Sequence, residues 1–431
     1  MKESIKKRIE AVRRGEVPEG NVSQNHQLRP VDWKYEKIGK YLVPYDEFSN
    51  DTKAYPLATS SRQGLMLQSE YYIDQRYEET TGGFHVVPVG YVTYRHMSDD
   101  DIFRFNLNKI GQSVLVSPEY PVFTTTGGLN QDLLVAYLNG MKEFQAFCSA
   151  QKKGSTRTRM YFRRLCEFTI PIPSITEQQK IAEILATCDR MIELKQSKID
   201  ELKKLKQVCL LEMFPQKGQT IPKRRFPGFS APWEQRKLNE VGVVIDPHPS
   251  HRAPKETTEG IPFIGIGDVD EDGNINKSSA RIVNEKVFDE HRRRYDLNIP
   301  SLGLGRVASL GKVIRLRADI GKYAVSPTMS VLQFNNDVNI DYIYAYMNSS
   351  QFQWQFEGKS NGSTRQSVGT EMVRILNLAI PADIKEQQQI GSYFSNLDHL
   401  ITLHQRELAE AGKYKKALMQ LLLTGLVRVK A

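Results

Sequence analysis

A chain of 431 residues, 40% hydrophobic and 25% charged, is long enough for more than one hydrophobic core, so we expect at least two domains. Its 59 Lys and Arg against 50 Asp and Glu leave a formal charge of +9, which favours a polyanionic partner without demonstrating one. No run approaches the roughly 18 apolar residues of a membrane span, and the N-terminal segment lacks the apolar stretch of a signal peptide. These features argue against a membrane protein and predict a cytoplasmic one with reduced cysteines.

The first elements are a short helix and a domain of mixed structure. Residues 1–20 are charged, and their pattern predicts a basic helix ended by Gly15 and Pro18. Residues 21–170 contain short runs rich in Val, Ile, Tyr and Phe, separated by Gly, Pro, Asn and Asp, which is typical of strands and turns. A helical patch, QDLLVAYLNGMKEFQAF, follows the strands. The range is predicted to be a mixed α/β domain.

Residues 171–213 carry the longest helical pattern in the first half of the chain. Ser174 and Glu177 form a sequence pattern typical of a capping box, which predicts the start of a helix. Apolar residues then recur with a period of 3.5 over about four heptads, as in a coiled-coil seam. The predicted seam positions are Ile181, Leu185, Ile192, Lys195, Ile199 and Leu202.

The second half of the chain repeats this order. A linker rich in Pro, Gly and basic residues, 214–230, leads to a second strand-and-turn segment, 231–379, and a second long helix in 380–431. The segment SITEQQKIAEIL aligns with DIKEQQQIGSYF at an offset of 209 residues (174 to 383), and the tetrapeptide GSTR occurs at 154–157 and at 362–365. The matching seam positions are Ile390, Phe394, Leu397, Ile401, His404 and Leu408. We therefore predict an internal repeat of two mixed α/β domains, each followed by a long helix.

Lys195 and His404 interrupt the two apolar seams at matching positions. One interpretation is a lysine that reaches out to solvent and a half-exposed histidine. The other is a polar break that fixes how the helices pair, as single polar residues do in coiled coils. Both interpretations remain open from the sequence.

The sequence contains no nucleotide-binding lysine loop, no GxSxG and no HExxH, so no motif points to a catalytic site. The acidic stretch DVDEDGNINKSS is spaced like an EF-hand loop, but its twelfth residue is Ser279 rather than Glu, and a β-turn is the preferred interpretation.

Basic residues gather beside GSTR in both copies, although a cluster of this kind can also be an ordinary solvated face. Arg281, Arg306, Arg315 and Arg317 add to the basic character of the second copy. Gly allows close backbone approach, while Ser, Thr and Arg donate hydrogen bonds, which suits a phosphate clamp. The candidate DNA-binding residues are Lys152, Lys153, Gly154, Ser155, Thr156, Arg157 and Arg159 in the first copy, and Arg292, Arg293, Arg294, Gly362, Ser363, Thr364 and Arg365 in the second.

Two binding domains held apart by stiff helices would act as a ruler on DNA. A helix of about 38 residues spans roughly 57 Å, which corresponds to about 17 base pairs of duplex. Because the two copies differ most in their strand regions, each is expected to read a different half-site. The predicted target is therefore asymmetric and bipartite, with an unread spacer.

The repeated segments resemble the specificity subunits of type I restriction–modification systems. The similarity rests on KGSTRTRMYFRRLCEFTIPIPSITEQQKIAEILATCDRMIELKQ and its copy, on RRFPGFSAPWEQRKLNEV and on IPFIGIGDVDEDGNI, and it extends over nearly the whole chain. It implies two α/β target-recognition domains separated by two long antiparallel coiled-coil helices with pseudo-twofold symmetry. The second copy, AIPADIKEQQQI, lacks the second proline of IPIPSITEQQKI, so its docking surface is expected to differ.

The resemblance also implies partners and cofactors. The chain itself would bind double-stranded DNA and have no activity alone. Two modification subunits would methylate adenine with S-adenosylmethionine, and restriction subunits would cleave DNA with ATP and Mg²⁺. No metal or cofactor is expected in this chain.

Two other functions remain as alternatives. The chain could be a coiled-coil scaffold that presents two protein-binding modules, or a self-contained nuclease or methyltransferase. Binding to random duplex DNA that weakens steeply with salt would favour the DNA-binding function over the scaffold. Cleavage or methyl transfer by the isolated chain would favour the third.

Overall fold

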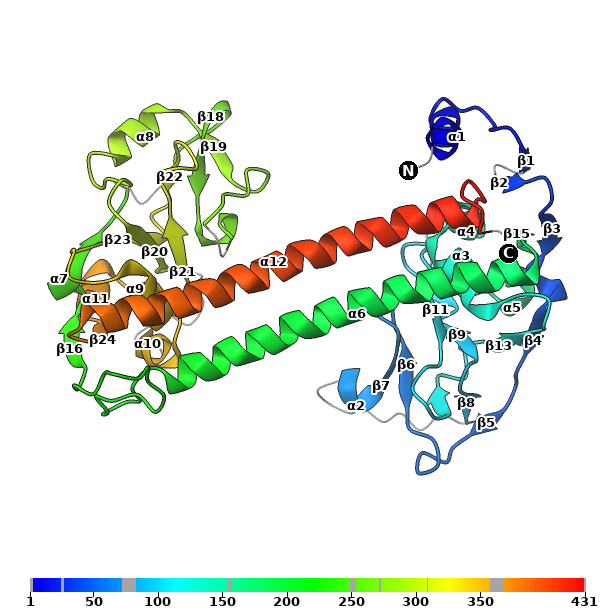
Figure 1. The fold of residues 1–431 in the computed structure, drawn as a ribbon, viewed down its shortest axis with the longest axis horizontal. Helices are drawn as coiled ribbons and strands as arrows, with labels where there is room; N and C mark the ends of the chain where they lie inside the picture. Colours follow the sequence, from blue (N-terminus) through cyan, green and yellow to red (C-terminus); the bar gives the residue numbers. More distant parts are fainter. Residues whose placement is uncertain are drawn as a thin grey trace. The chain divides into compact units, whose positions relative to one another are not determined.

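The computed structural model describes residues 3–24, 27–71, 83–152, 157–248, 253–270, 273–307, 309–356 and 367–429. The chain forms two compact units, which can be followed by colour in Figure 1. Unit 1 comprises Met1–Glu193 and Ala409–Ala431, and unit 2 comprises Leu194–Leu408. The long helices α6 (Ile175–Glu212, 38 residues) and α12 (Ile384–Leu423, 40 residues) each contribute one part to either unit.

Unit 1 is built on a four-stranded antiparallel sheet in the order β11–β9–β13–β4. A smaller sheet, β12–β8–β5, and the ribbon β3–β15 complete its main strand pairings. The strands are β1 (Asn21–Gln24), β2 (Gln27–Pro30), β3 (Lys34–Lys37), β4 (Leu42–Pro44), β5 (Phe48–Ser49), β6 (Ala58–Ser60), β7 (Leu65–Leu67), β8 (Phe84–Val87), β9 (Val92–Tyr94), β10 (Met97–Ser98), β11 (Phe105–Leu107), β12 (Val114–Val116), β13 (Val122–Thr125), β14 (Thr158–Arg159) and β15 (Thr169–Ile172). The helices before α6 are α1 (Glu3–Arg13), α2 (Gln68–Tyr71), α3 (Gln131–Gly140), α4 (Lys142–Ser149) and α5 (Phe162–Leu165).

Unit 2 has a four-stranded antiparallel sheet in the order β17–β23–β20–β21. Its second sheet, β19–β18–β22, contains one parallel pair, between β18 and β22. The strands are β16 (Glu234–Lys237), β17 (Gly242–Ile245), β18 (Glu256–Ile264), β19 (Arg281–Val283), β20 (Ser301–Gly305), β21 (Val313–Leu316), β22 (Ala324–Val325), β23 (Met329–Phe334) and β24 (Asn377–Ile380). The helices before α12 are α7 (Leu238–Val241), α8 (Lys286–His291), α9 (Ile340–Met347), α10 (Ser350–Gln353) and α11 (Thr370–Arg374).

The two units repeat the same topology, as the sequence predicted. The order β4–β13–β9–β11 in unit 1 corresponds strand for strand to β17–β23–β20–β21 in unit 2, and the ribbon β3–β15 corresponds to β16–β24. In both units a helix begins after the fourth of these sheet strands along the chain, β13 or β23. Asn130 caps α3 and Asn339 caps α9, each accepting a backbone N–H of the first turn through its side chain. The mixed α/β fold with an internal repeat is therefore confirmed.

The long helices run antiparallel to one another. In unit 2, Lys195 of α6 pairs with Glu407 of α12 at 2.8 Å, and Lys206 pairs with Asp398 at 2.5 Å. Residue numbers thus fall along α12 as they rise along α6. The antiparallel helix pair that the family resemblance implied is confirmed.

Both ends of each long helix enter a hydrophobic core. Ile181 and Leu185 from the start of α6 lie in the core of unit 1, together with Leu422 and Leu423 from the end of α12. The opposite ends of the two helices lie in the core of unit 2.

In unit 2, Ile390 and Phe394 from the start of α12 share the core with Cys209 from the last turn of α6 and with Met213 and Phe214 directly after it. Burial of these terminal turns makes the helices part of each unit's core rather than exposed arms.

Each of the two capping boxes expected at the helix starts forms only one of its two hydrogen bonds, the one to the side chain of the capping residue. The Ser174 hydroxyl accepts a hydrogen bond from the Glu177 amide at 3.3 Å, and the Asp383 carboxylate accepts one from the Lys385 amide at 2.8 Å. The carboxylates of Glu177 and Glu386, expected to return to the cap, bind arginines instead. Tertiary contacts have replaced the local ones.

The N-terminal helix α1 (Glu3–Arg13) forms as the sequence predicted and contacts the segment after α12. Arg8 of α1 donates a hydrogen bond to the carbonyl of Gly425, just beyond α12, at 3.2 Å. The four cysteines are free thiols, with Cys148 and Cys209 buried. Among the described residues, no helix combines the length and apolar character needed to cross a bilayer.

Candidate nucleic-acid interface and helix junctions

Only part of the predicted DNA-binding set can be placed. Lys153, Gly154, Ser155, Thr156, Gly362, Ser363, Thr364 and Arg365 lie outside the described residues. The GSTR tetrapeptides therefore stay a prediction, apart from Arg157, and the described candidates are Lys152, Arg157, Arg159 and Arg292–Arg294.

In unit 1 the candidate cations lie against an acidic turn. Arg157 donates from Nε to the Asp99 carboxylate at 2.6 Å, and the Lys152 ammonium lies 3.7 Å from that of Asp101. Asp101 has φ of 62° and accepts a hydrogen bond from the Thr158 hydroxyl. A phosphate bound here would compete with Asp99 and Asp101 for Arg157 and Lys152. Arg159, on β14, is exposed.

In unit 2, Arg292, Arg293 and Arg294 form an exposed basic turn after α8. Arg292 lies over the Phe288 ring at 5.7 Å, and Arg294 donates to the Asp246 carbonyl at 3.3 Å. Within the described part of the chain, no carboxylate pairs with these three side chains. They are the more accessible of the two described sets of predicted cations.

Other arginines of unit 2 have structural partners. Arg306 is only 7% exposed and donates to the Pro327 carbonyl at 3.0 Å, so its guanidinium is unavailable to a phosphate. Arg315 pairs with Asp341 at 2.5 Å and lies over the Tyr344 ring at 4.1 Å. These side chains belong to the packing of unit 2.

The predicted seam residues divide into buried and partly exposed groups. The buried ones are Ile181, Leu185, Ile199, Leu202, Ile390, Phe394, Leu397 and Ile401. Ile192, Lys195, His404 and Leu408 are partly exposed. The seam is thus tightest toward the domain cores and more open around its polar positions.

The two polar seam positions meet at one carboxylate. Lys195 donates to Oε2 of Glu407 at 2.8 Å, and Nδ1 of His404 lies 3.3 Å from the same oxygen. Hydrogen bonding to Lys195, the largest cause, lowers the pKa of Glu407 from its ordinary value. Of the two interpretations of the polar break, this geometry supports the one in which it specifies helix pairing.

Replacing Lys195 and His404 together by leucine is expected to scramble the register of the helix pair or its oligomeric state, because the polar break is lost. The change in the free energy of unfolding should be small, since Lys195, His404 and Glu407 are all partly solvated. Light scattering after gel filtration measures the oligomeric state, and Lys198→Leu, an exposed lysine of the same helix, is the control. An unchanged, monodisperse double variant would contradict this role.

The repeated EQQ motif makes the most extensive polar junction in unit 1. The buried carboxylate of Glu177 accepts two hydrogen bonds from Arg428, both at 2.8 Å, and one from the Trp33 indole at 3.1 Å. Arg428 also binds Asp32 through two hydrogen bonds of 2.8 and 2.9 Å. The segment that follows α12 is thereby bonded to the first turn of α6, and the hydrogen bond to Glu177 raises the pKa of Arg428.

The copy in unit 2 repeats this arrangement with its own arginine. Arg225, from the segment after α6, donates to both oxygens of Glu386 at 2.6 and 2.8 Å. Trp233 occupies the position of Trp33, but its indole N–H has no partner among the described residues. The segment that follows each long helix therefore forms a salt bridge with the first turn of the other helix.

The first glutamine of EQQ also has the same role in both units. The side-chain carbonyl of Gln178 accepts from the Asn130 amide at 2.7 Å, and that of Gln387 accepts from the Asn339 amide at 2.8 Å. Their amide groups donate to the carbonyls of Pro173 and Pro381. The glutamine thus fixes the domain helix α3 or α9 to the start of a long helix. The sequence signal for this junction was the exact recurrence of EQQ, whose arginine partners no local pattern indicated.

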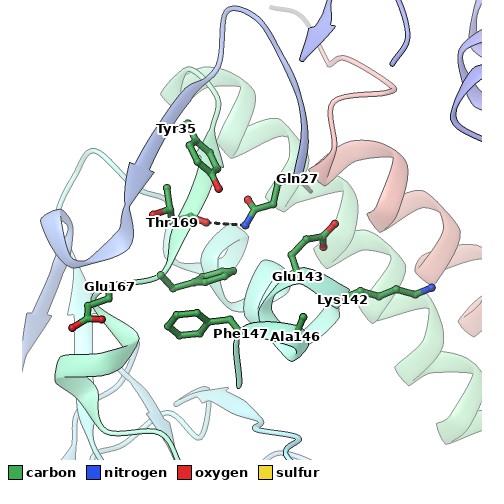
Figure 2. A pocket seen from close by; sticks show the side chains of 9 residues that line it. Gln27, Tyr35, Lys142, Glu143, Ala146, Phe147, Glu167 and Thr169 are labelled. Atoms are coloured by element: carbon green, nitrogen blue, oxygen red, sulfur yellow. Dashed lines mark hydrogen bonds between the residues drawn. The ribbon is translucent and has the colours of Figure 1, made fainter. Parts of the chain in front are cut away.

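A cavity of about 560 Å³ lies beside the ribbon β3–β15 of unit 1 (Figure 2). Gln27 lies on one side and donates to the Thr169 carbonyl at 3.1 Å, and the other lining residues include Tyr35, Lys142, Glu143 and Phe147. One oxygen of Glu143 is buried without a partner in the described residues. A cavity with this carboxylate suits a hydrogen-bond donor and does not suit DNA phosphate.

A matching cavity of about 690 Å³ lies beside the ribbon β16–β24 of unit 2. Its lining is rich in amides, including Gln235 and Asn377 at the positions of Tyr35 and Thr169, and contains the half-exposed Trp354 beneath Lys217. The two units therefore keep a hollow at the same junction but with different chemistry.

His291, at the end of α8, is fully buried with both ring nitrogens unpartnered among the described residues. Its ring lies 4.7 Å from that of His248. Burial, followed by repulsion from His248 and Arg294, lowers the pKa of His291 from 6.5 to about 4. The side chain is neutral at physiological pH and lies beneath the exposed basic turn.

We expect the stability of unit 2 to fall as the pH drops from about 6.5 to about 4. Over this range the unfolded His291 binds a proton that the folded one does not, so the loss reaches about 3 kcal/mol at the lower end. Hydrogen exchange across a pH series measures it. His291→Phe should flatten this part of the profile, whereas identical profiles for the two proteins would show that His291 has no such role.

Two repeated α/β units joined through an antiparallel helix pair define a tandem-repeat protein with two candidate nucleic-acid surfaces. The family model for the type I restriction modification DNA specificity domain matches residues 106–204 and 231–412. The chain therefore belongs to the type I restriction–modification DNA specificity family.

Individual proteins agree with this assignment. The type I restriction enzyme MjaVIII specificity subunit of Methanocaldococcus jannaschii is 23% identical over 435 residues, which cover 96% of this chain and 97% of that protein. The fold is similar to the crystal structure of a type I restriction–modification S subunit from M. genitalium, with a TM-score of 0.57, 14% identity and coverage of 91% and 96%. It is also similar to a chain from a structural study of assembly and conformational transition in a type I system, with a TM-score of 0.53, 13% identity and coverage of 93% and 99%.

Proposed function

We propose that this specificity subunit selects an asymmetric, bipartite DNA target, with each α/β unit reading one half-site. The observation that carries the proposal is the repeat itself: two sheets of identical strand order, each locked to the same helix pair by the same EQQ junction. The scaffold is common to both units, whereas the loops and small sheets differ. A common scaffold with different edges suits the recognition of two different sequences.

The DNA contacts proposed for the described residues are unequal in the two units. Arg292–Arg294 offer three exposed guanidinium groups in unit 2, and Arg159 is the exposed candidate on β14 of unit 1. Their role would be to hold phosphate, which positions each unit, while base contacts come from groove-facing side chains.

We propose that the chain performs no chemistry itself. In this arrangement, modification subunits would use S-adenosylmethionine to methylate adenine, and restriction subunits would use ATP and Mg²⁺ to cleave DNA. Within the described residues, no three His, Cys, Asp or Glu side chains are grouped as a metal site. Methyl transfer to DNA by the isolated chain would overturn this part of the proposal.

The test of target selection is methylation sequencing of DNA from cells that contain the chain with its modification subunits. We expect one adenine mark in each half of a bipartite motif, on opposite sides of an unread spacer. A continuous motif would contradict two separate readers. A separate measurement tests the scaffold alternative. If the affinity of the purified chain for random duplex DNA does not depend on salt concentration, the scaffold alternative would be favoured.

Exposed apolar residues on the two long helices form the docking surface that we propose for partner subunits. They stand at equivalent positions of the repeat, with spacings of 3 and 11 residues that keep each set on one helix face. The residues are Met191, Leu194 and Leu205 on α6, and Leu400, Leu403 and Tyr414 on α12. Two equivalent apolar stripes fit two copies of one partner, which supports two modification subunits per chain.

Replacing one leucine of a stripe by glutamate should remove one partner copy. We expect Leu194→Glu or Leu403→Glu to reduce the number of modification subunits from two to one, and the double variant to lose both, because the charge is buried on docking. Co-expression, affinity purification and light scattering measure the stoichiometry. Gln196→Glu and Gln405→Glu, exposed and equivalent in the repeat, are the controls. Two bound copies on the double variant would rule out these stripes.

A further inference from the structure

A cavity of about 380 Å³ in unit 2 brings together basic side chains from three elements. Lys206 comes from α6, Arg406 from α12, and Lys312 from the turn that precedes β21. The other lining residues include Asp270 and the polar side chains of Asn348, Thr402 and Gln405. The site lies where the four-stranded sheet meets the helix pair, and its lining includes no residue of the basic turn after α8.

Two of these cations, Lys206 and Lys312, retain the capacity to bind a further anion. The Lys206 ammonium forms an ion pair of 2.5 Å with the nearly buried Asp398, which holds the side chain in place. The three N–H groups of the ammonium can donate to a further anion. Lys312 is exposed, and no carboxylate of the described residues pairs with it. Among the described residues, the cavity is lined by three cations and one carboxylate, Asp270, and the ion pair with Lys206 adds Asp398 as a second, so this described set has a net positive charge.

Unit 1 repeats the core of this arrangement. Lys415 of α12 pairs with Asp189 of α6, and each lies 209 residues from its counterpart (206 to 415, and 189 to 398). Arg104 directly precedes β11, as Lys312 precedes β21, and β11 and β21 occupy the same place in the two sheets.

The Asp189 carboxylate also acts on Arg104. Partial desolvation lowers the pKa of Arg104, and the negative charge of Asp189 opposes that shift. Lys415 and Arg104 thus both interact with Asp189, the first through an ion pair and the second electrostatically.

The similarity of the two clusters is informative because their surroundings have diverged. β9 and β20 differ in sequence, as VTY and SLGLG, yet a basic residue precedes the next strand in both units. A target-independent ligand explains why the charge recurs where the sequence-reading surfaces differ. The DNA backbone is such a ligand, because its phosphates have the same chemistry at every sequence.

We propose that Lys206 with Lys312, and Lys415 with Arg104, form two equivalent phosphate-binding sites for the DNA that continues from each half-site into the spacer. This inference rests on the proposed DNA-binding function and extends it to contacts that carry no sequence information. Each aspartate orients its lysine, whose remaining N–H groups donate to a phosphate oxygen.

The experiment measures binding of the full-length chain to a random duplex of about 40 base pairs by fluorescence anisotropy, at salt concentrations from about 50 to 300 mM. Each phosphate contact contributes about 0.9 to the slope of log K against log salt. We expect Lys206→Gln/Lys312→Gln to reduce the slope by about 2, and Arg104→Gln/Lys415→Gln to do the same. The matched control is Lys198→Gln/Lys413→Gln, which removes two exposed lysines from the same helices.

A second variant guards against misfolding. Lys312→Gln changes an exposed side chain with no carboxylate partner among the described residues, and it should lower the slope by about 1. A slope equal to that of the parent chain in both double variants would overturn the phosphate sites and leave the proposed function intact. The absence of any salt dependence in the parent chain would overturn the proposed function itself. The methylated motif should remain unchanged in all variants.

Discussion

Replacing Glu386 by alanine is expected to lower the free energy of unfolding of unit 2 by about 3–5 kcal/mol. Glu386 is 1% exposed and binds Arg225, which is 11% exposed, through two hydrogen bonds of 2.6 and 2.8 Å. Removing the carboxylate leaves the guanidinium buried without a counter-charge. Hydrogen exchange of unit 2 segments measures the loss, because two units of one chain need not unfold together.

The control for this prediction is Glu371→Ala. Glu371 pairs with Arg374 at 2.5 Å, but its side chain is 81% exposed, so its removal should change stability by less than about 1 kcal/mol. Arg225→Leu/Glu386→Leu removes both charges and should recover part of the loss. Equal effects of the two single alanine variants would show that the buried pair does not hold this junction.

Phe394→Ala is expected to destabilise unit 2 by about 3–5 kcal/mol. Phe394, near the start of α12, is fully buried and stacks on Phe214, two residues beyond the end of α6, with ring centroids 5.6 Å apart and an interplanar angle of 17°. Truncation opens a cavity between the ends of two helices and removes an aromatic contact. Loss of protection should appear at both helix ends of unit 2.

Leu403→Ala serves as the comparison on the same helix. Leu403 is exposed, so its truncation should change stability by less than about 0.5 kcal/mol while it weakens partner docking. If Phe394→Ala cost less than about 1 kcal/mol, the helix ends would contribute little to the core of unit 2.

Local patterns explain why the long helices and the repeat could be predicted. The 3.5-residue period from Ile181 to Leu202 depends only on neighbours along the chain, and the structure buries both of these side chains. The strand-and-turn texture similarly indicated the α/β class. The recurrence of EQQ and GSTR marked the repeat, although the GSTR segments are mostly outside the described residues.

Contacts between distant segments could not be predicted in the same way. Glu177 and Glu386 fit a capping box, because local spacing was the only information available for them. Their partners, Arg428 and Arg225, lie 251 and 161 residues away along the chain. A buried charge–charge contact outweighs a solvated cap, so the local expectation was only half right.

The amino-acid sequence by itself determined the repeat, the helix periodicity and the family, since each depends on the order of residues along one dimension. Only the tertiary structure decided which cations are available. Arg306 is buried and bonded to a carbonyl, so it is unavailable to a phosphate. Lys152 and Arg157 pair with acidic side chains. Lys206 and Lys312 line the same cavity. The reason is physical: a charge's availability depends on solvent and on groups within a few ångströms, and folding brings those groups from positions that the linear order leaves far apart.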